Sequence, residues 1–121
     1  GGVLASLYAE IAADCGDAPG LAALATDCRE IAAWMVSDAS LDDRLAGSVP
    51  FCTMSAVAVA GWQLQRQARA LAGEDRPQAK AKAVVARYFA THIASEARGL
   101  KVQATAGADL LYALSAEALA G

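Results

Sequence analysis

The segment VPFCTMSAVAVAGW, residues 49–62, carries apolar or small side chains around nearly the whole circumference of a helix. At 1.5 Å per residue such a helix is about 20 Å long, which is too short for the roughly 30 Å hydrocarbon core of a bilayer. A short helix without a polar face needs other helices around it. The pattern therefore predicts a helical bundle in which this segment is the enclosed central member, with no membrane association.

Two amphipathic helices are predicted before this segment. Apolar side chains at helical spacing extend from residue 3 to about residue 14, where a Cys-Gly-Asp sequence is a good terminator. A second apolar stripe repeats at intervals of three and four residues between about residues 19 and 38. The polar stretch from about residue 39 to residue 48 is expected to be a connection, although Ser40 begins a pattern typical of a capping box.

Further helices are predicted after this connection. The central helix is expected to begin near Pro50 and to continue as an amphipathic helix to about residue 71, before a Gly-Glu-Asp-Arg-Pro break. The next helix extends from residue 77 to about residue 97, and a last helix from residue 100 or 102 to about residue 118. The packed face of the residue 77–97 helix is expected to comprise its larger apolar side chains together with neighbouring residues, namely Ala81, Val84, Val85, Tyr88, Phe89, His92 and Ile93.

Four long helices joined by short loops favour antiparallel neighbours. We therefore expect an all-α fold: an up-down four-helix bundle with an additional N-terminal or broken C-terminal helix. At 121 residues the chain is long enough for one hydrophobic core, so residues 1–121 are expected to form a single helical bundle domain. The first two residues are glycines, and we expect the domain to be a fragment of a longer chain.

The composition agrees with a helical core and argues against several functions. Apolar residues make up 56% of the chain, above the usual 45–50%, and it contains only three prolines. The net charge is −3 and the basic residues are scattered, whereas binding to nucleic acid requires a basic stripe. Three cysteines without a CxxC pair are typical of a reducing compartment, so we expect a cytoplasmic protein.

The residues that could carry chemistry form no catalytic constellation. His92 is the only histidine, and a metal site in a helical bundle needs histidines on two helices, so no metal is expected. Cys28 and Cys52 fall on apolar faces, and Cys15 lies beside two aspartates that would raise its pKa, so none is predicted to be a nucleophile. We expect His92 to be a buried or half-buried packing residue. The alternative, a phosphoacceptor, requires an exposed imidazole and a nearby cation, and no lysine follows one turn later.

Gly61 and Trp62 point to a place where helices meet. A glycine inside a helix costs about 1 kcal/mol relative to alanine, so Gly61 indicates the close approach of another helix, with Trp62 covering the junction. A contact between subunits or domains is the alternative. Trp34 is expected on the flank of its helix, where the indole can reach a neighbouring element. The candidate packing or interface residues are Trp34, Gly61, Trp62, Tyr88, Phe89 and His92.

Three pieces of the sequence resemble the helical C-terminal extension of the larger bacterial acyl-CoA dehydrogenases. They are AVAVAGWQLQRQA, KAKAVVARYFATHIASEA and TAGADLLYAL, in this order. Many members of the family have a proline after the histidine segment, where this chain has Ser95 and Glu96. The positions that match the family's pattern are Gly61, Trp62, Tyr88, Phe89, His92, Gly107, Ala108, Leu110, Leu111 and Leu114.

This resemblance implies a domain that supports catalysis without performing it. The family's parent enzymes are FAD-dependent oxidoreductases that form an α,β-double bond in an acyl-CoA thioester, and their flavin and catalytic carboxylate belong to an upstream core. We expect this chain to hold no cofactor, to pack against the upstream catalytic core of the same chain or at a subunit interface, and to form a homo-oligomer. The alternative is a free-standing helical interaction module or a His-phosphotransfer-like bundle.

Overall fold

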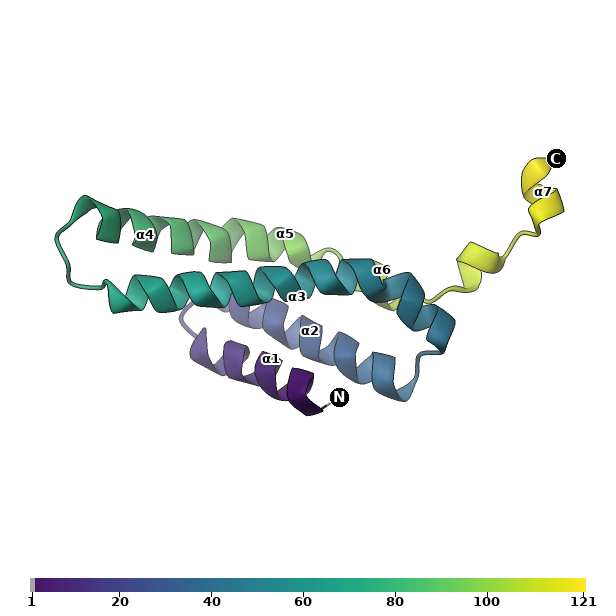
Figure 1. The fold of residues 1–121 in the computed structure, drawn as a ribbon, viewed down its shortest axis with the longest axis horizontal. Helices are drawn as coiled ribbons and strands as arrows, with labels where there is room; N and C mark the ends of the chain where they lie inside the picture. The colour runs from purple at the N-terminus through teal and green to yellow at the C-terminus, as the bar shows by residue number, and fades with distance from the viewer. Residues whose placement is uncertain (1) are drawn as a thin grey trace.

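The computed structural model describes residues 2–121 as a series of helices, and this range contains no strand (Figure 1). The prediction of an all-α fold is therefore confirmed. Four helices make up most of the molecule, and short turns connect them. They are α1 (Gly2–Asp14), α2 (Pro19–Ser37), α3 (Leu41–Ala70) and α4 (Pro77–Tyr88).

The second half of the chain continues α4 and then becomes irregular. A π-helical turn (Phe89–Ile93) joins α4 to α5 (Ala94–Arg98), so these elements form one rod that ends close to the predicted position. Short elements follow it: α6 (Lys101–Thr105), a 3₁₀ turn (Asp109–Tyr112) and α7 (Ala116–Ala120).

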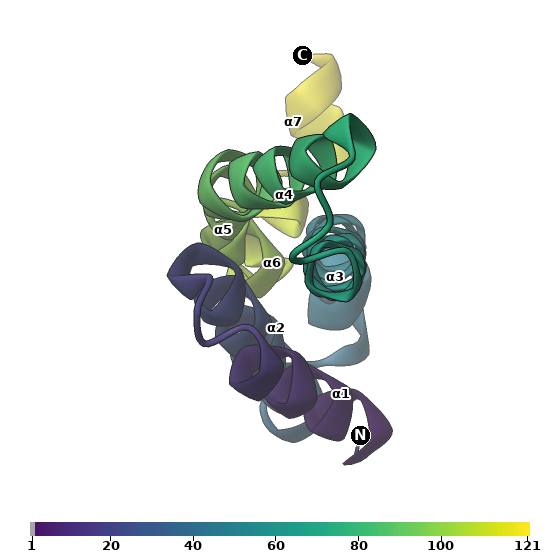
Figure 2. The same ribbon diagram turned by 90° about the vertical axis from the view of Figure 1, so that its left-hand side faces the viewer.

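The long helices surround a common core. The end-on view shows α3 beside both α2 and the α4–α5 rod, with α1 at the outer side of α2 (Figure 2). The elements α2, α3 and α5 contact one another in pairs, whereas α1 packs mainly against α2. The centre is thus a group of three helices with α1 at one side, and this arrangement does not establish the regular four-helix bundle that the loop lengths suggested.

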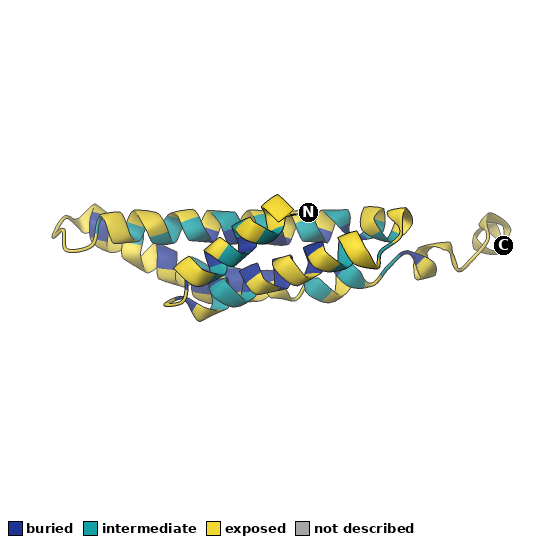
Figure 3. Ribbon diagram, turned by 90° about the horizontal axis from the view of Figure 1, so that it is seen from below, coloured by how far each residue is buried: buried dark blue, intermediate teal, exposed yellow. Residues whose placement is uncertain are grey.

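The predicted apolar stripe of α2 forms the middle of the core. Its buried side chains meet those of α1 and α3, and Figure 3 shows the buried residues lying where these helices face each other. This stripe obeys the helical period without interruption, which is why the sequence predicts it well. The largest fully buried side chains are Tyr8, Ile11, Cys15, Leu21, Leu24, Cys28, Ile31 and Met54.

Helix α3 begins nine residues before Pro50 and includes that proline, so the predicted polar connection over residues 39–48 is wrong. The Ser40 Oγ accepts a hydrogen bond from the Asp43 N–H, and the Asp43 carboxylate accepts one from the Ser40 N–H, both at 3.1 Å. This capping box starts the helix early. Pro50 is buried inside α3 and lacks the N–H of one helical hydrogen bond, and the helix nevertheless continues through it to Ala70.

The apolar segment 49–62 is only half enclosed, contrary to the prediction. Its buried residues are Pro50, Met54, Ala58 and Gly61, whereas the opposite side is open to solvent and Val49 is 74% exposed. Because α3 has 30 residues, the length argument against a membrane does not hold either. Within residues 2–121, α3 is the one helix long and apolar enough to cross a bilayer, a criterion that core helices of soluble proteins also meet.

The rod from α4 to α5 packs through small side chains, so the predicted packed face is wrong. The larger side chains Val84, Val85 and Tyr88 are exposed, and Phe89 and Ile93 are only partly buried. Alanine allows the helix axes to approach more closely than valine or tyrosine would. The close approach therefore selects the alanine face, which consists of Ala79, Ala86, Ala90, Ala94 and Ala97.

The expected last helix, from residue 100 or 102 to about 118, is replaced by short turns. Gly107 adopts a positive φ of 79°, and the Ala108 N–H donates to the Asp43 carboxylate at 2.9 Å. The positive φ of Gly107 ends the helix after α6, and the hydrogen bond to Asp43 holds the chain against the start of α3. Beyond this point residues 109–121 are exposed, and Figure 1 shows them extending away from the bundle.

Candidate functional site

Gly61 lies at a close crossing of three elements. A Cβ at this position would lie 2.7 Å from the Leu21 Cδ1 in α2 and 3.2 Å from the Phe89 Cδ1 in the π-helical turn. Distances below 3.0 Å require a neighbour to move, so glycine lets α3 approach both partners. Gly61 and Phe89 therefore act in packing inside the domain.

Trp62 forms a polar junction between α3 and the end of α1. Its indole Nε1 donates to the Asp14 carboxylate at 2.7 Å, and Arg69 donates to the other oxygen of that carboxylate at 3.0 Å. The Arg66 guanidinium lies 5.3 Å from the centre of the indole ring, within range of a cation–π contact. These hydrogen bonds, that from Trp62 above all, lower the pKa of the Asp14 carboxyl.

His92 is exposed, which contradicts the expectation that it is buried or half-buried. Its ring stacks on Tyr88 with the ring centres 4.6 Å apart and the planes at 27°. Arg87 and Thr91 line the same shallow hollow beside these rings. The position thus meets the requirement of exposure for a phosphoacceptor. Trp34, by contrast, is partly buried on α2.

The three cysteines differ in environment. Cys15 and Cys28 are fully buried, whereas Cys52 is exposed, so its predicted place on a packed face is wrong. Burial raises the pKa of Cys28 to about 11, and burial followed by the charge of Asp14 raises that of Cys15. A thiol with a raised pKa is a weak nucleophile at neutral pH. Neither buried cysteine is suited to nucleophilic catalysis.

Asp27 is the one buried charged residue among residues 2–121, and the sequence did not predict its burial. Its carboxylate accepts a hydrogen bond from Arg98 at 2.6 Å and lies 3.4 Å from the Lys101 ammonium group, which also pairs with Glu30. This cluster joins α2 to the break between α5 and α6. Nothing local predicts it, because Asp27 and Lys101 are 74 positions apart.

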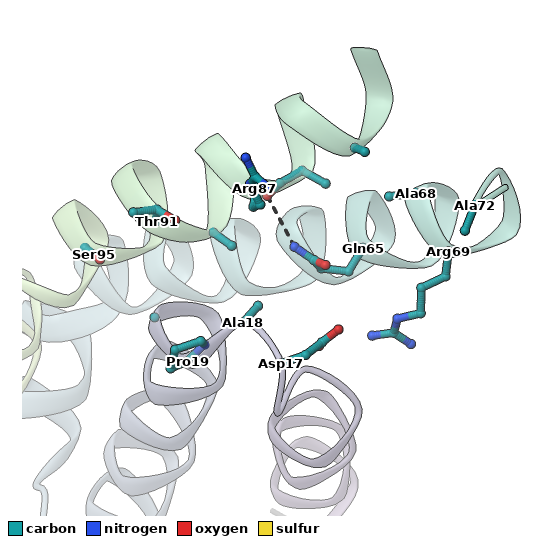
Figure 4. A pocket seen from close by; sticks show the side chains of 14 residues that line it. Asp17, Ala18, Pro19, Gln65, Ala68, Arg69, Ala72, Arg87, Thr91 and Ser95 are labelled. Atoms are coloured by element: carbon teal, nitrogen blue, oxygen red, sulfur yellow. Dashed lines mark hydrogen bonds between the residues drawn. The ribbon is translucent and has the colours of Figure 1, made fainter. Parts of the chain in front are cut away.

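A hollow of about 410 Å³ lies between the start of α2, the second half of α3 and the rod from α4 to α5 (Figure 4). Much of its lining is alanine. Gln65 reaches across it and donates to the Ala86 carbonyl oxygen at 3.2 Å. Arg69, at one end, is already paired with Asp14. The hollow thus offers space between helices, but its polar groups do not converge on one point as those of an active site do.

The described residues provide no further basis for catalysis or metal binding. No group of three or more His, Cys, Asp or Glu side chains with metal-binding geometry occurs among residues 2–121. In the same range every buried side-chain nitrogen or oxygen has a hydrogen-bond partner. On the surface of the same range many large apolar side chains are exposed.

A comparison with protein families identifies the chain. A family model described as acetyl-CoA dehydrogenase C-terminal like matches residues 7–115. Since this match covers most of the chain, the protein belongs to that family and is a C-terminal acyl-CoA dehydrogenase-like domain. No curated protein and no solved structure matches it significantly. The resemblance drawn from the three sequence pieces is thus confirmed.

Proposed function

We propose that the chain is a non-catalytic helical domain of a FAD-dependent acyl-CoA dehydrogenase-like oxidoreductase, in which it packs against the catalytic core. The parent enzyme acts in fatty acid metabolism in the cytoplasm, and the core lies upstream in the same chain. The family match supports this proposal, together with the lack of a catalytic constellation in residues 2–121.

The exposed C-terminal segment is the observation that carries the proposal. Residues up to 115 belong to the family match, so Leu110, Leu111 and Leu114 are part of the family's sequence pattern. Leu110 is nevertheless 90% exposed, and the other two leucines are exposed as well. Burying one leucine side chain is more favourable than leaving it exposed to water by about 1.5–3 kcal/mol. A surface outside this domain is needed to cover them, and the catalytic core of the parent is the one we propose.

The residues of this chain do not fit a flavin. A flavin requires an enclosed slot with polar groups aimed at its ring system, whereas the polar side chains that line the hollow of about 410 Å³ do not converge on one point. No buried polar side-chain atom in residues 2–121 is left without a partner to serve such a ligand. We therefore assign FAD to the upstream core, and no step of the dehydrogenation to this domain.

Hydrogen exchange on the full-length parent enzyme tests the proposed docking. The backbone of residues 109–115 is expected to exchange slowly in the parent and quickly in the 121-residue chain. Exchange that is equally fast in both would overturn the proposal. So would a native reading frame that begins near residue 1, without an upstream flavoprotein core.

A pair of variants sharpens the test. Leu110→Ser together with Leu111→Ser is expected to lower the melting temperature of the parent enzyme, because two docked leucines are lost. The control is Leu119→Ser, which changes another exposed leucine beyond the family match and is expected to have no effect.

A His-phosphotransfer-like module is the second candidate, because His92 is exposed and Arg87 lines the same hollow. Incubation with acetyl phosphate would then produce an acid-labile phosphoryl group that the His92→Gln variant lacks. Under the main proposal no such group forms. Mass spectrometry of the intact chain distinguishes the two functions.

A further inference from the structure

The packed body of the domain meets the exposed C-terminal segment at Ala108. Ala104 is fully buried and Ala108 is 4% exposed, whereas residues 109–121 are all exposed. The body side of this boundary is closely packed, since a Cβ on Gly47 in α3 would lie 2.1 Å from the Ala104 carbonyl oxygen. Ala108 is thus the last buried residue before the segment.

One carboxylate holds Ala108 in place. The Oδ1 of Asp43, in the first turn of α3, accepts a hydrogen bond from the Ala108 N–H at 2.9 Å, and its Oδ2 accepts one from the Ser40 N–H at 3.1 Å. We call these two hydrogen bonds the Asp43 anchor. They lower the pKa of the Asp43 carboxyl below its ordinary 3.8, that from Ser40 above all. The carboxylate is therefore ionised at neutral pH.

Gly107 turns the chain toward this carboxylate. Its φ of 79° lies in a region that residues other than glycine rarely adopt. A Cβ at this position would lie 3.1 Å from the Asp43 Oδ1, so glycine also leaves room for the carboxylate. The conformation of Gly107 thereby presents the next N–H to Asp43.

The capping box alone does not require an aspartate at position 43. A glutamine at the same place in a capping box also accepts a hydrogen bond from the N-cap N–H. A glutamine side chain has one acceptor oxygen, whereas a carboxylate has two. Asp43 uses its second oxygen for Ala108, so it connects the start of α3 with the end of the body.

The anchor limits where the first leucines of the segment can lie. Leu110 is two residues after Ala108, so its Cα stays within about 7 Å of the Ala108 Cα. Without the hydrogen bond from Ala108, the last closely packed residue is Ala104, and Leu110 could lie up to about 22 Å from it. An approximately threefold longer reach increases the accessible volume more than about tenfold, and the effective concentration of the leucines at a docking surface falls accordingly.

We propose that Asp43 is a positioning residue for docking, because the Asp43 anchor holds the beginning of residues 109–115 at the start of α3, where Leu110 and Leu111 meet the catalytic core. This inference rests on the proposed function, which assigns the docking of that segment to the core. It adds the residue that orders the segment before docking. Ordering in advance reduces the conformational entropy that docking would otherwise cost.

Amide exchange in the 121-residue chain tests the anchor itself. In Asp43→Gln, which keeps an acceptor for the Ser40 N–H, the Ala108 amide is expected to exchange at least about tenfold faster, because its charged acceptor is lost. Ser40→Ala is the matched control: it removes the capping hydroxyl but keeps both N–H groups of the anchor. Ala108 exchange should then change less than about twofold. The amide of the fully buried Leu24 reports global opening and corrects both values.

A pH titration gives a second signature of the anchor. Because the folded pKa of Asp43 is depressed, the anchor is intact above pH 3.8 and is lost as the pH falls through the folded pKa. The Ala108 amide proton resonance is expected to shift with a midpoint below pH 3.8 in the unchanged chain and in Ser40→Ala. Asp43→Gln should lack this shift.

Hydrogen exchange of residues 109–115 in the full-length parent enzyme tests the positioning role. Asp43→Gln is expected to speed this exchange at least about fivefold, because the segment is no longer held near its docking surface. Ser40→Ala also weakens the start of α3, but it should change the exchange less than about twofold, because the anchor remains.

The outcomes separate this inference from the proposed function. If residues 109–115 exchange slowly in the parent and equally slowly in its Asp43→Gln variant, docking stands and the positioning role is overturned. Equal effects of Asp43→Gln and Ser40→Ala also overturn it, as does an Ala108 amide that Asp43→Gln leaves protected in the 121-residue chain. Fast exchange of residues 109–115 in the unchanged parent overturns the proposed function, and this inference with it.

Discussion

Single residues decide how closely the helices of this domain approach. A Cβ on Gly47 would lie 2.1 Å from the Ala104 carbonyl oxygen, and one on Gly61 would lie 2.7 Å from a Leu21 methyl carbon. The first obstacle is backbone, whereas the second is the end of a side chain that can turn. The two glycines therefore differ in how strictly they are required, although the sequence drew attention only to Gly61.

Gly47→Ala is expected to destabilise the domain by about 1–3 kcal/mol, because α3 and α6 must separate to admit the methyl group. Gly61→Ala is expected to cost less, since Leu21 can adjust and alanine favours the helix by about 1 kcal/mol. Urea unfolding followed by circular dichroism gives both values. Gly16→Ala serves as the control, because its Cβ would make an ordinary contact at 3.7 Å. A larger loss for Gly61 than for Gly47 would contradict this account.

Protonation of Asp14 is expected to change the fluorescence emission of Trp62, which donates a hydrogen bond to its carboxylate. Hydrogen bonds from Trp62 and Arg69 lower its pKa below the ordinary 3.8. Because the folded pKa is depressed, the stabilisation is present above pH 3.8 and is lost as the pH falls through the folded value. In a Trp34→Phe variant, the emission of Trp62 should change with a midpoint below pH 3.8, while circular dichroism shows intact helices. The Asp14→Asn variant should lack this transition.

At the scale of elements, the sequence predicted a helix correctly where the hydrophobic pattern and the terminating residues indicate the same ends. It failed where contacts between distant segments determine the ends or the packed face of a helix. The stripe of α2 and the breaks before Pro77 and at Gly99 lie close to their predicted positions. Pro50 suggested a helix start, but the capping box at Ser40 had already begun the helix. The packed face of α4 was misassigned because hydrophobic size was taken as a guide, whereas close helix approach selects alanine.

The candidate site was predicted less well than the fold. The resemblance identified the family. The exposure of His92 and of Val49 in α3, however, depends on which neighbours cover each helix face, and this is a tertiary property. The cluster around Asp27 joins residues more than 70 positions apart, so no local sequence pattern predicts it. An aspartate on the apolar side of α2 was the one available signal.

Asp27→Asn is expected to lower stability by about 1–2 kcal/mol, because the charged partners of this buried carboxylate are partly exposed and regain water. Glu30→Gln, which removes an exposed partner of Lys101, should cost less than about 0.5 kcal/mol.

The same cluster predicts a pH dependence. Glu30 and Asp27 raise the pKa of Lys101 above 10.5, so the stability that this ion pairing contributes is present below pH 10.5 and is lost as the pH rises through the folded pKa. Urea unfolding at neutral and at high pH measures both effects. Equal losses for the two variants would show that burial of Asp27 is unimportant.

At the scale of the whole molecule, the chain consists of a packed body and an exposed C-terminal segment. Every residue from 109 to 121 is exposed, including five large apolar side chains. The body ends at Ala108, whose N–H donates to Asp43. Two apolar surfaces are therefore exposed: this segment and the side of α3 that carries Leu41, Leu45 and Val49.

Deletion of residues 109–121 is the experiment that separates the body from this segment. Because the deleted side chains bury almost no surface within the chain, the melting temperature of the isolated domain is expected to change by less than about 2 °C, equivalent to a few tenths of a kcal/mol. The same deletion in the full-length enzyme should lower its melting temperature, since there the leucines are covered by the core. Asp43→Asn, which weakens the acceptor of the Ala108 N–H at the boundary, provides the comparison within the body and should destabilise the isolated domain more than the deletion does. A large loss on deletion in the isolated domain would place the segment within its core.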